Sequence, residues 1–471
     1  MSGSRTSGAM AQKVRRIHMV GIGGVGMSAI AEVLLNLGYE VWGSDLSEGD
    51  AVRRLRSHGA HIFVGHEAEQ VRDADVVVIS SAVPSTNPEV VAARAAKTPV
   101  IQRAEMLAEL MRLELGIAIA GSHGKTTTTS MVGGILHHAG LDPTVVVGGK
   151  LNSVGSGAQL GKGPYLVAEA DESDGSFVHL SPTIAVVTNI DAEHLDHYAG
   201  GLDEVREAFR AFLARLPFYG LAILCGDHPD VQALLPGLER RVTTYGLNPQ
   251  AELRAVDVRF EGPETTFEVL GPEGSRGRHR LHMLGEHNVL NALAALAVAD
   301  ELGVPPEVAR AGLEAFSGVD RRFSERGEAR GIRVVDDYGH HPEEIRATLR
   351  GARQGYPDRR LVAVFQPHRY SRTAHLLQDF GRAFHDAETV YVLPVYAAGE
   401  APIVGAGQAE VIAALRDHGH RDVRSLEGLQ SATELLLDEL RSGDLVIAFG
   451  AGDVGRLGRA LIAALEGPQA E

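Results

Sequence analysis

The chain has 471 residues, which is too long for one core of ordinary size, so we expect roughly two to four domains. Hydrophobic residues make up 44% of the chain and charged residues 23%, a composition typical of globular proteins. The formal net charge of −16 argues against sequence-independent binding of nucleic acid, which requires a basic face. We therefore expect no nucleic-acid partner, and we expect any anionic ligand to be held by local clusters of cations.

The first residues and the single cysteine predict where the protein works. Residues 1–16 are rich in Ser, Gly and Arg and lack the apolar centre of a signal peptide, which predicts a flexible tail. No apolar run approaches the ~20 residues that span a bilayer, so we expect no membrane partner. One cysteine, Cys225, excludes an internal disulfide framework and favours the reducing cytoplasm.

The first predicted unit begins with a strand, a glycine-rich turn and a helix. The strand from Ile17 runs into G-x-G-x-x-G at residues 21–26. A second predicted strand, 40–43, ends just before Asp45, close to the distance at which a dinucleotide fold places its ribose-binding acid. A third strand, 74–79, ends at Ser80 and Ser81, and open α/β sheets bind ligands at such strand ends. This pattern indicates a bound diphosphate and, taken alone, it fits NAD.

The most informative stretch is G-I-A-I-A-G-S-H-G-K-T-T-T-T-S at residues 116–130. Its apolar run at 117–120 predicts a buried parallel strand, and the pattern at 131–138 predicts a helix. Small and hydroxyl residues connect the two. The stretch therefore predicts a strand, a phosphate loop and a helix.

The residues of this loop suit a nucleotide. Gly121 and Gly124 let backbone N–H groups point inward, and the helix N-terminus adds partial positive charge. Lys125 reaches the outer phosphates, and the Thr126 hydroxyl is a ligand for Mg²⁺. The spacing departs from G-x-x-x-x-G-K-[ST], because Ile119 stands where the first glycine is expected.

Two further strand ends carry candidate metal ligands. The predicted strand 165–168 leads into E-A-D-E-S-D at 169–174, where four carboxylates repel one another unless a cation or basic ligand is present. We expect Glu169 to bind Mg²⁺ beside the phosphate loop, the alternative being a solvated acidic turn. The strand 183–187 leads into T-N-I-D-A-E-H, whose His194 is the candidate for a second metal position.

The remaining motifs lie further along the chain. In G-E-H-N-V-L-N-A, His287 and Asn291 share one helix face and suit the edge of a base, although the cluster also fits a helix N-cap. The predicted strands 332–335 and 361–365 end in D-D-Y-G-H-H-P and Q-P-H-R-Y-S-R. Together with the preceding D-R-R-F they predict a cationic cluster of Arg322, His340, Arg369 and Arg372.

A second G-x-G-x-x-G occurs at residues 450–455, after the predicted strand 445–449. We call each G-x-G-x-x-G motif a glycine fingerprint. Because the chain has two of them, a nicotinamide-dependent oxidoreductase or an NAD-binding protein stays open as an alternative function. The phosphate loop between them makes a plain dehydrogenase the less favoured of the two interpretations.

Five motifs taken together, in this order, resemble the Mur ligases, the ATP-dependent amide-forming enzymes of bacterial cell-wall precursor synthesis. They are G-I-G-G-V-G-M-S, G-S-H-G-K-T-T-T, E-A-D-E-S-D, H-N-V-L-N-A, and D-D-Y-G-H-H-P with H-R-Y-S-R, and the resemblance covers Ile17 to Ala464. It implies an α/β fold with a Rossmann-like UDP-sugar domain (17–113), a central ATPase domain with a parallel sheet (114–318) and a C-terminal Rossmann-like domain (319–471). It also implies closure of the last domain over the site, with a hinge near 317–320.

The resemblance implies that the lactyl carboxylate of UDP-N-acetylmuramate attacks the γ-phosphate of ATP to give an acyl phosphate. The amine of L-alanine then attacks the carbonyl carbon, and phosphate leaves. The implied cofactors are ATP and Mg²⁺, with Mn²⁺ as a substitute, and the implied state is a monomer or homodimer. A recycling ligase that adds a tripeptide to the same UDP-sugar shares nearly every motif and stays open as an alternative.

The resemblance also assigns residues to the three ligands. The implied ATP contacts are Gly121, Ser122, His123, Gly124, Lys125, Thr126, Thr127, His287, Asn288, Asn291, Arg322 and Asp337. The implied UDP-sugar contacts are Gly21, Gly23, Gly24, Gly26, Asp45, Ser81, Arg103 and His123. The implied metal ligands are Thr126, Glu169 and His194, and the implied catalytic residues are Lys125, His194, His340, Arg369 and Arg372.

One departure from sister ligases is visible in the lysines. In several sister ligases of the family, a carbamoylated lysine of the central domain helps to hold the second metal ion. This chain has no lysine beyond Lys162, and the predicted helix after His194 carries Arg206 and Arg210 instead. Arginine stays protonated and forms no carbamate, so we expect the second metal to depend on His194 and substrate oxygens.

Overall fold

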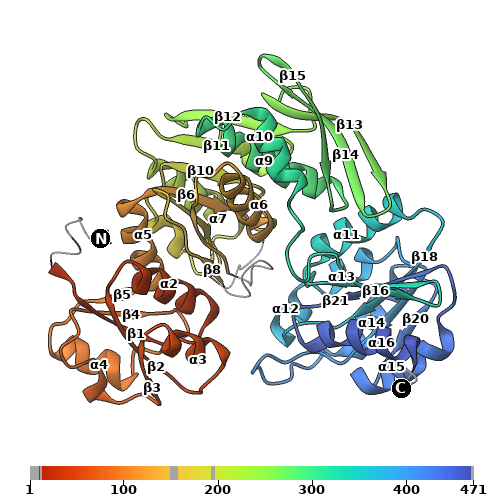
Figure 1. The fold of residues 1–471 in the computed structure, drawn as a ribbon. Helices are drawn as coiled ribbons and strands as arrows, with labels where there is room; N and C mark the ends of the chain where they lie inside the picture. The colour runs from red at the N-terminus through yellow and green to blue at the C-terminus, as the bar shows by residue number, and fades with distance from the viewer. Residues whose placement is uncertain (1–9, 11–12, 149–156, 193–196, 468–471) are drawn as a thin grey trace. The chain divides into compact units, whose positions relative to one another are not determined.

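The computed structural model describes residues 10, 13–148, 157–192 and 197–467 of an α/β protein (Figure 1). These residues form two compact units. The first contains the chain through Val256 together with Glu268–His279 and Leu290–Phe316, and the second contains Asp257–Phe267, Arg280–Val289 and the chain from Ser317. The chain thus enters the second unit for the last time at Ser317, inside the predicted hinge. The predicted domain boundaries and the hinge itself stay predictions.

The N-terminal sheet has five parallel strands in the order β3-β2-β1-β4-β5. The order reverses beside β1, so the loop after β1 lies at the switch point where such sheets bind ligands. All four residues of β4 are buried, as expected for a strand covered on both faces. The elements are β1 (Arg16–Val20), α2 (Val25–Asn36), β2 (Glu40–Asp45), α3 (Asp50–Ser57), β3 (His61–Val64), η1 (Ala68–Val71), β4 (Val76–Ile79), α4 (Pro88–Ala95), β5 (Val100–Gln102) and α5 (Arg103–Leu113).

The central sheet has the order β15-β14-β13-β12-β11-β10-β6-β9-β7-β8. Its strand β6 lies between β10 and β9, is parallel to both and is almost entirely buried. The strands are β6 (Leu115–Ala120), β7 (Thr144–Val146), β8 (Ala158–Gln159), β9 (Tyr165–Ala170), β10 (Ile184–Val187), β11 (Leu221–Cys225), β12 (Arg241–Gly246), β13 (Leu253–Glu261), β14 (Glu264–Gly271) and β15 (Gly274–Leu281). The helices are α6 (Lys125–His138), η2 (Ser176–His179), α7 (Leu202–Ala214), α8 (Pro229–Gln232), α9 (Glu286–Glu301) and α10 (Pro306–Glu314).

The C-terminal sheet has the order β16-β17-β21-β18-β19-β20, in which only the edge strand β16 is antiparallel. An aromatic cluster on one face contains Phe365, Phe380, Phe384 and Phe449. The strands are β16 (Ser324–Ala329), β17 (Ile332–Asp337), β18 (Arg360–Phe365), β19 (Thr389–Val392), β20 (Val423–Ser425) and β21 (Asp444–Phe449). The helices are α11 (Pro342–Gly355), α12 (Tyr370–His375), α13 (Leu377–Ala383), α14 (Gln408–Asp417), α15 (Leu429–Glu439), η3 (Asp453–Arg456) and α16 (Leu457–Glu466).

Several predicted strands were too short, because each prediction stopped at the first polar residue. Strand β9 continues through Glu169, which pairs with Ile119 of β6, and β17 continues through Asp337, which pairs with Phe449 of β21. These carboxylates therefore project from rigid strands and not from loops. Strands β13 to β15 were missed, since their alternating exposed residues carry a weak apolar signal.

Among the described residues, no helix combines the length and the apolar character that crossing a bilayer requires.

Candidate active site

The phosphate loop joins β6 to α6, and two of its positions require glycine. Gly121 has φ +133°, and a Cβ built there would lie 2.1 Å from Thr188 Oγ1. Gly124 has φ +82°, and its Cβ would lie 2.5 Å from Asn291 Oδ1. Any other residue would be strained and would also collide with the neighbouring elements. The predicted roles of both glycines as turn residues therefore agree with the geometry.

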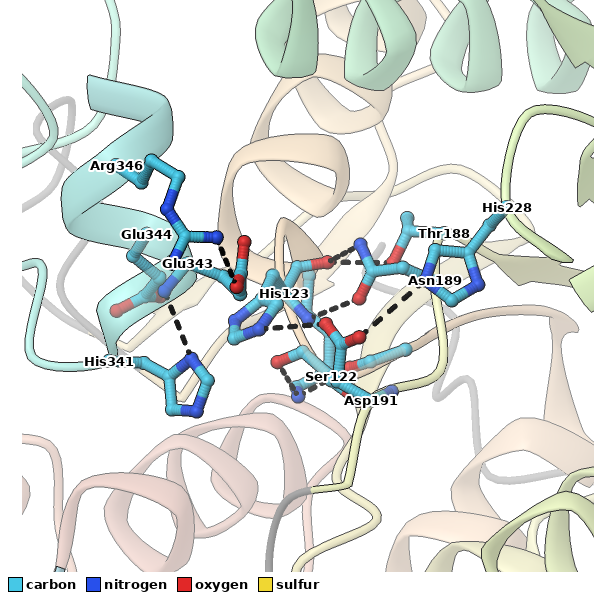
Figure 2. Close-up of polar contacts among 12 residues, drawn as sticks. Ser122, His123, Thr188, Asn189, Asp191, His228, His341, Glu343, Glu344 and Arg346 are labelled. Atoms are coloured by element: carbon cyan, nitrogen blue, oxygen red, sulfur yellow. Dashed lines mark hydrogen bonds and ion pairs between the residues drawn. The ribbon is translucent and has the colours of Figure 1, made fainter. Parts of the chain in front are cut away.

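The residues after β10 hold this loop in place, as Figure 2 shows. Thr188 Oγ1 donates a hydrogen bond of 2.7 Å to the carbonyl O of His123. Asn189 binds the same residue twice, because its Oδ1 accepts from His123 N at 2.7 Å and its Nδ2 donates to His123 O at 3.1 Å. Asp191 N donates to Ser122 Oγ at 2.8 Å. The backbone of the loop is thus fixed by polar contacts within the protein itself.

A carboxylate lies between two histidines beside the loop (Figure 2). Asp191 Oδ2 lies 3.1 Å from His123 Nε2, and Asp191 Oδ1 lies 3.6 Å from His228 Nε2. Burial alone would raise the pKa of the Asp191 carboxyl, but hydrogen bonds from both histidines hold that pKa well below its usual range. Asp191 therefore stays ionised and orients the His123 ring.

Lys125 is engaged within the loop and by a buried carboxylate. Its Nζ donates to the carbonyl oxygens of Gly121 at 2.6 Å and Ser122 at 3.1 Å. It also contacts both carboxylate oxygens of Glu172, at 3.0 and 2.8 Å. Burial raises the pKa of the Glu172 carboxyl, whereas the Lys125 ammonium opposes that shift and favours the ionised form. The sequence pointed to Lys125 but not to its partner Glu172.

Glu169 and Thr126 form the described part of the predicted metal site. Burial raises the pKa of the Glu169 carboxyl, and a hydrogen bond with the Thr126 side chain opposes this shift. In the described part of the chain, Glu169 Oε1 is a buried oxygen without a hydrogen-bond partner. A buried carboxylate oxygen beside a hydroxyl fits a hard divalent cation such as Mg²⁺. The third predicted ligand, His194, lies outside the described residues.

Without His194, the described residues contain no group of three or more His, Cys, Asp or Glu side chains arranged to hold a metal ion. The predicted metal set of Thr126, Glu169 and His194 stays a prediction.

Helix α9 contributes to the phosphate loop. Asn291 Oδ1 accepts a hydrogen bond of 3.1 Å from Thr128 Oγ1, so Asn291 braces the first turn of α6. One turn earlier, Asn288 Nδ2 donates to Leu284 O at 2.7 Å and lies 3.1 Å from His287 Nε2. The structure thus gives Asn291 a contact that the sequence did not suggest. The predicted binding of adenine by His287, Asn288 and Asn291 stays a prediction.

The first glycine fingerprint, residues 21–26, contacts the carboxylate of Asp45. Gly23 N donates to Asp45 Oδ2 at 2.8 Å, and a Cβ at Gly23 would lie 2.8 Å from that same oxygen. A Cβ at Gly26 would lie 2.8 Å from Arg103 Nη1, and Arg103 Nη2 lies 3.5 Å from Asp171 Oδ2. Arg103 therefore connects this fingerprint to the acidic motif after β9. Of the other predicted sugar contacts, Gly21, Gly24 and Ser81 come after the neighbouring strands β1 and β4, and His123 lies in the loop after β6.

In the second unit, Arg322 and Asp337 lie beside Glu344. Arg322 Nη1 forms an ion pair of 3.1 Å with Glu344 Oε1. Asp337 accepts hydrogen bonds from Phe323 N at 2.9 Å and Gly339 N at 2.7 Å. Burial raises the pKa of the Asp337 carboxyl to about 6, although Arg322 opposes this shift. The predicted cation Arg322 is thus already compensated by a carboxylate that the sequence did not single out.

Two uncharged histidines lie close together in the same unit. Burial lowers the pKa of His340 and of His368 to about 4, so both rings are neutral at pH 7. Their ring centroids are 6.1 Å apart, and Tyr396 stacks on His368 at 5.6 Å. Arg372 Nη1 lies 3.4 Å from His368 Nδ1. The predicted cationic cluster therefore needs correction, because His340 is not a cation.

Arg369 completes this cluster from an unusual backbone position. Its φ is +67°, and its backbone N donates to Tyr396 O at 2.8 Å. A non-glycine residue in this region costs roughly 1–3 kcal/mol, which the surrounding contacts must offset. The functional roles of His340, Arg369 and Arg372 stay predictions.

The second glycine fingerprint does not form a nucleotide loop. A Cβ at Gly452 would lie 2.5 Å from Gln366 Oε1 and 2.7 Å from Tyr396 Cγ. Gln366 Oε1 also accepts from Val454 N at 3.1 Å, and the next turn, η3, has only four residues. Gln366 and Tyr396 therefore pack directly against Gly452. The NAD interpretation is not favoured.

A phosphate loop after a central parallel strand, with carboxylates from the next strand around its lysine, defines a nucleotide-dependent enzyme of the α/β class. Three family models match the chain in succession: "Mur ligase family, catalytic domain" over residues 16–114, "Mur ligase middle domain" over 119–299, and "Mur ligase, glutamate ligase domain" over 321–452. The chain belongs to the Mur ligase family. This confirms the family prediction and the predicted three-domain α/β fold, and it supports ATP as the nucleotide.

Known proteins similar to this chain carry a specific activity in their names. A "UDP-N-acetylmuramate--L-alanine ligase" of Pelobacter propionicus is 56% identical over 454 residues, covering 96% of this chain and 99% of the relative. The crystal structure of UDP-N-acetylmuramate-alanine ligase MurC from Thermotoga maritima has a TM-score of 0.79 at 31% identity, covering 96% and 99% of the two chains. A murein peptide ligase from Psychrobacter arcticus has a TM-score of 0.67 at 25% identity, covering 97% and 100%.

Proposed function

We propose that this protein joins L-alanine to UDP-N-acetylmuramate with consumption of ATP, in the synthesis of peptidoglycan precursors. The observation that carries the proposal is 56% identity to a ligase of that name over 96% of the chain. The recycling alternative is less favoured, because the similarity to the murein peptide ligase is lower in both identity and TM-score. The oxidoreductase alternative is not favoured, since three Mur ligase models match the chain in succession.

The reaction brings a carboxylate and a triphosphate together, so their mutual repulsion must be offset by cations. Lys125 would bind the γ-phosphate by sharing with ATP the ammonium that contacts Glu172. Thr126, Glu169 and His194 would hold Mg²⁺, or Mn²⁺ in its place. The buried Glu169 Oε1, which has no partner in the described structure, supports this assignment. A divalent cation there would neutralise phosphate charge.

The second unit would supply the contacts to the amine and part of the nucleotide site. His340 Nδ1 lies 3.1 Å from the carbonyl O of Tyr338, so Nδ1 carries the proton and Nε2 is left as an acceptor. Because the ring is neutral, Nε2 is suited to accept a hydrogen bond from the ammonium of L-alanine. Arg369 and Arg372 would stabilise the charge that develops on the acyl phosphate. Asp337 would bind the ribose.

The proposal includes a cytoplasmic location, a monomeric or homodimeric state and closure of the C-terminal domain about residues 317–320. Closure is expected because the predicted catalytic and binding groups come from all three predicted domains. Small-angle scattering tests this part: the radius of gyration should fall when ATP, Mg²⁺ and both substrates are present. An unchanged radius would contradict closure.

Phosphate release with ATP, Mg²⁺ and UDP-N-acetylmuramate tests the activity. L-alanine, glycine, L-serine and the L-alanyl-γ-D-glutamyl tripeptide are added in parallel reactions. Turnover that prefers L-alanine supports the proposal, whereas a preference for the tripeptide moves the protein to recycling. If no amine gives release, the ligase function itself is contradicted.

A further inference from the structure

The ammonium of Lys125 is fully engaged in the described structure. Among the described residues, its contacts include the carbonyl oxygens of Gly121 and Ser122 and both carboxylate oxygens of Glu172. A lysine ammonium has only three N–H donors. A phosphate oxygen of ATP therefore reaches Lys125 only if one of these acceptors gives up its contact.

The acceptor most suited to leave is the carboxylate of Glu172. The two carbonyl oxygens belong to the loop itself, whose backbone is fixed by Thr188 and Asn189. Glu172 is different, because only its side chain needs to turn away. Its backbone is held independently, since Tyr198 Oη donates to Glu172 O at 2.6 Å. When a phosphate of ATP replaces the Glu172 carboxylate, the Lys125 ammonium still has one anionic partner, as it has without ATP.

Glu172 is built into the site and is not a chance surface contact. It is only 2% exposed, and the side chain of Lys125 is 15% exposed. A buried lysine without a counter-charge is strongly disfavoured, so the loop needs an anion at this position whenever no nucleotide is bound. Glu172 comes just after β9, the strand that pairs with β6, and this neighbouring position explains how it reaches the loop.

We propose that Glu172 is the resident counter-anion of Lys125, which positions the lysine in the empty loop and competes with the terminal phosphate of ATP for it. The carboxylate thereby lowers the affinity for ATP and helps phosphate to leave after the reaction, when it takes the ammonium back. This inference rests on the proposed ATP-dependent function and assigns a further positioning residue to the same site.

The variant Glu172→Gln tests the inference, because it keeps the size of the side chain and removes its charge. The dissociation constant of ATP with Mg²⁺, measured by calorimetry on the full chain, should fall roughly tenfold, the scale of one hydrogen bond to a charged group. Inhibition by inorganic phosphate should become stronger in the same variant. A merely structural role for Glu172 predicts the opposite sign, since a distorted loop would bind ATP more weakly.

Asp174→Asn is the matched control. Asp174 lies in the same acidic motif but accepts hydrogen bonds from Ser176, so this variant should leave the dissociation constant of ATP unchanged. An unchanged or raised constant in Glu172→Gln would overturn the inference while leaving the ligase function intact. Failure of the unaltered protein to bind ATP would instead overturn the proposed function.

Glu172→Asp provides a second test should the glutamine variant fold poorly. It keeps the charge but shortens the reach by one methylene, so it should weaken the hold on Lys125. The affinity for ATP should rise, by less than in Glu172→Gln. An affinity equal to or lower than that of the unaltered protein would overturn the inference.

Discussion

The loops after β6 and β21 begin in nearly the same way. Each strand lies inside a parallel sheet, and the first glycine of each loop has a similar φ, +133° at Gly121 and +145° at Gly450. A Cβ would collide in both cases, with Thr188 Oγ1 at 2.1 Å or with Gln366 O at 2.7 Å. Each loop is thus pressed against the end of a neighbouring strand, β10 in the first case and β18 in the second.

The two loops differ in the residues beyond their first glycine. The loop after β6 opens into α6, a helix of 14 residues, and carries Lys125 at its first position. The loop after β21 opens into η3, a turn of four residues that precedes α16, and Gln366 and Tyr396 pack against its Gly452. The glycines therefore report a tight junction between strand and loop, whereas anion binding depends on the helix and the charges beyond it.

Removal of the Lys125 side chain is the strongest test of the difference between the loops after β6 and β21. Lys125→Ala should lower kcat by roughly 10³-fold, because a fixed cation on the transferred phosphate is lost. Binding of UDP-N-acetylmuramate should be largely retained, since its predicted contacts lie mainly on the N-terminal domain. The two effects are measured by phosphate release and by the shift of the melting temperature with the UDP-sugar. Loss of both would mean that the two sites are not separate.

Glu169→Gln tests the cation at the same loop. The concentration of Mg²⁺ needed for half-maximal activity should rise roughly a hundredfold, because a charged metal ligand becomes neutral. A titration of activity with Mg²⁺ measures this effect, with Asp174→Asn as the control from the same motif. Equal requirements in both variants would remove Glu169 from the metal site.

The neutral histidines near the second loop predict a dependence of stability on pH. Burial lowers the folded-state pKa of His340 to about 4, below its ordinary value of 6.5. The stabilisation is therefore fully present above pH 6.5 and is lost as the pH falls toward 4. Between pH 7.5 and 5 this residue should cost about 2 kcal/mol of unfolding free energy.

The contribution of His340 is isolated by comparing His340→Gln with the unaltered protein in urea unfolding at several pH values. The variant should lose less stability on acidification. Since the carboxyl of Asp337, with its raised pKa, has the opposite sign, only the difference between the two curves is diagnostic. Parallel curves would show that His340 is not buried in its neutral form.

The smallest effect is expected at the second loop. Gly452→Ala should destabilise the protein by about 1 kcal/mol, because its Cβ meets Gln366 and Tyr396 in a filled space. Gly428→Ala is the control, since Gly428 has extended backbone and open space around it. Neither variant should change the affinity for ATP with Mg²⁺. A large loss of nucleotide affinity in Gly452→Ala alone would make this loop a candidate nucleotide site again.

The sequence predicted the parts of the site that local patterns encode. The strand, loop and helix around Lys125 could be predicted from a buried apolar run and two glycines, and Glu169 from its place at a strand end. Asp337 was placed in a loop, although it lies on β17, because a polar residue was taken as the end of the strand. Burial within a paired strand depends on the neighbouring strands of the sheet, so it cannot be predicted from one stretch of sequence.

Other functional candidates depend on contacts between distant segments. The site residues that the predictions omitted are Glu172, Asp191, His228, Glu344, His368 and Tyr396. Glu172 and Asp191 lie inside motifs that the sequence had singled out, so their carboxylates could have been named. His228 carries no such signal, because only its approach to Asp191 distinguishes it. The predicted positive charge of His340 was also wrong, since the pKa of its ring depends on burial within the folded unit.

The bracing of the phosphate loop by Thr188, Asn189 and Asp191 determines when the loop loses its conformational freedom. Those hydrogen bonds form as the sheet folds, so the entropy of ordering the loop is lost at folding and not at nucleotide binding. ATP then binds a loop that is already ordered, so little of the free energy of its contacts is offset by ordering the loop. In hydrogen exchange, the backbone amide of His123, bonded to Asn189, should be protected in the nucleotide-free protein almost as well as in its complex.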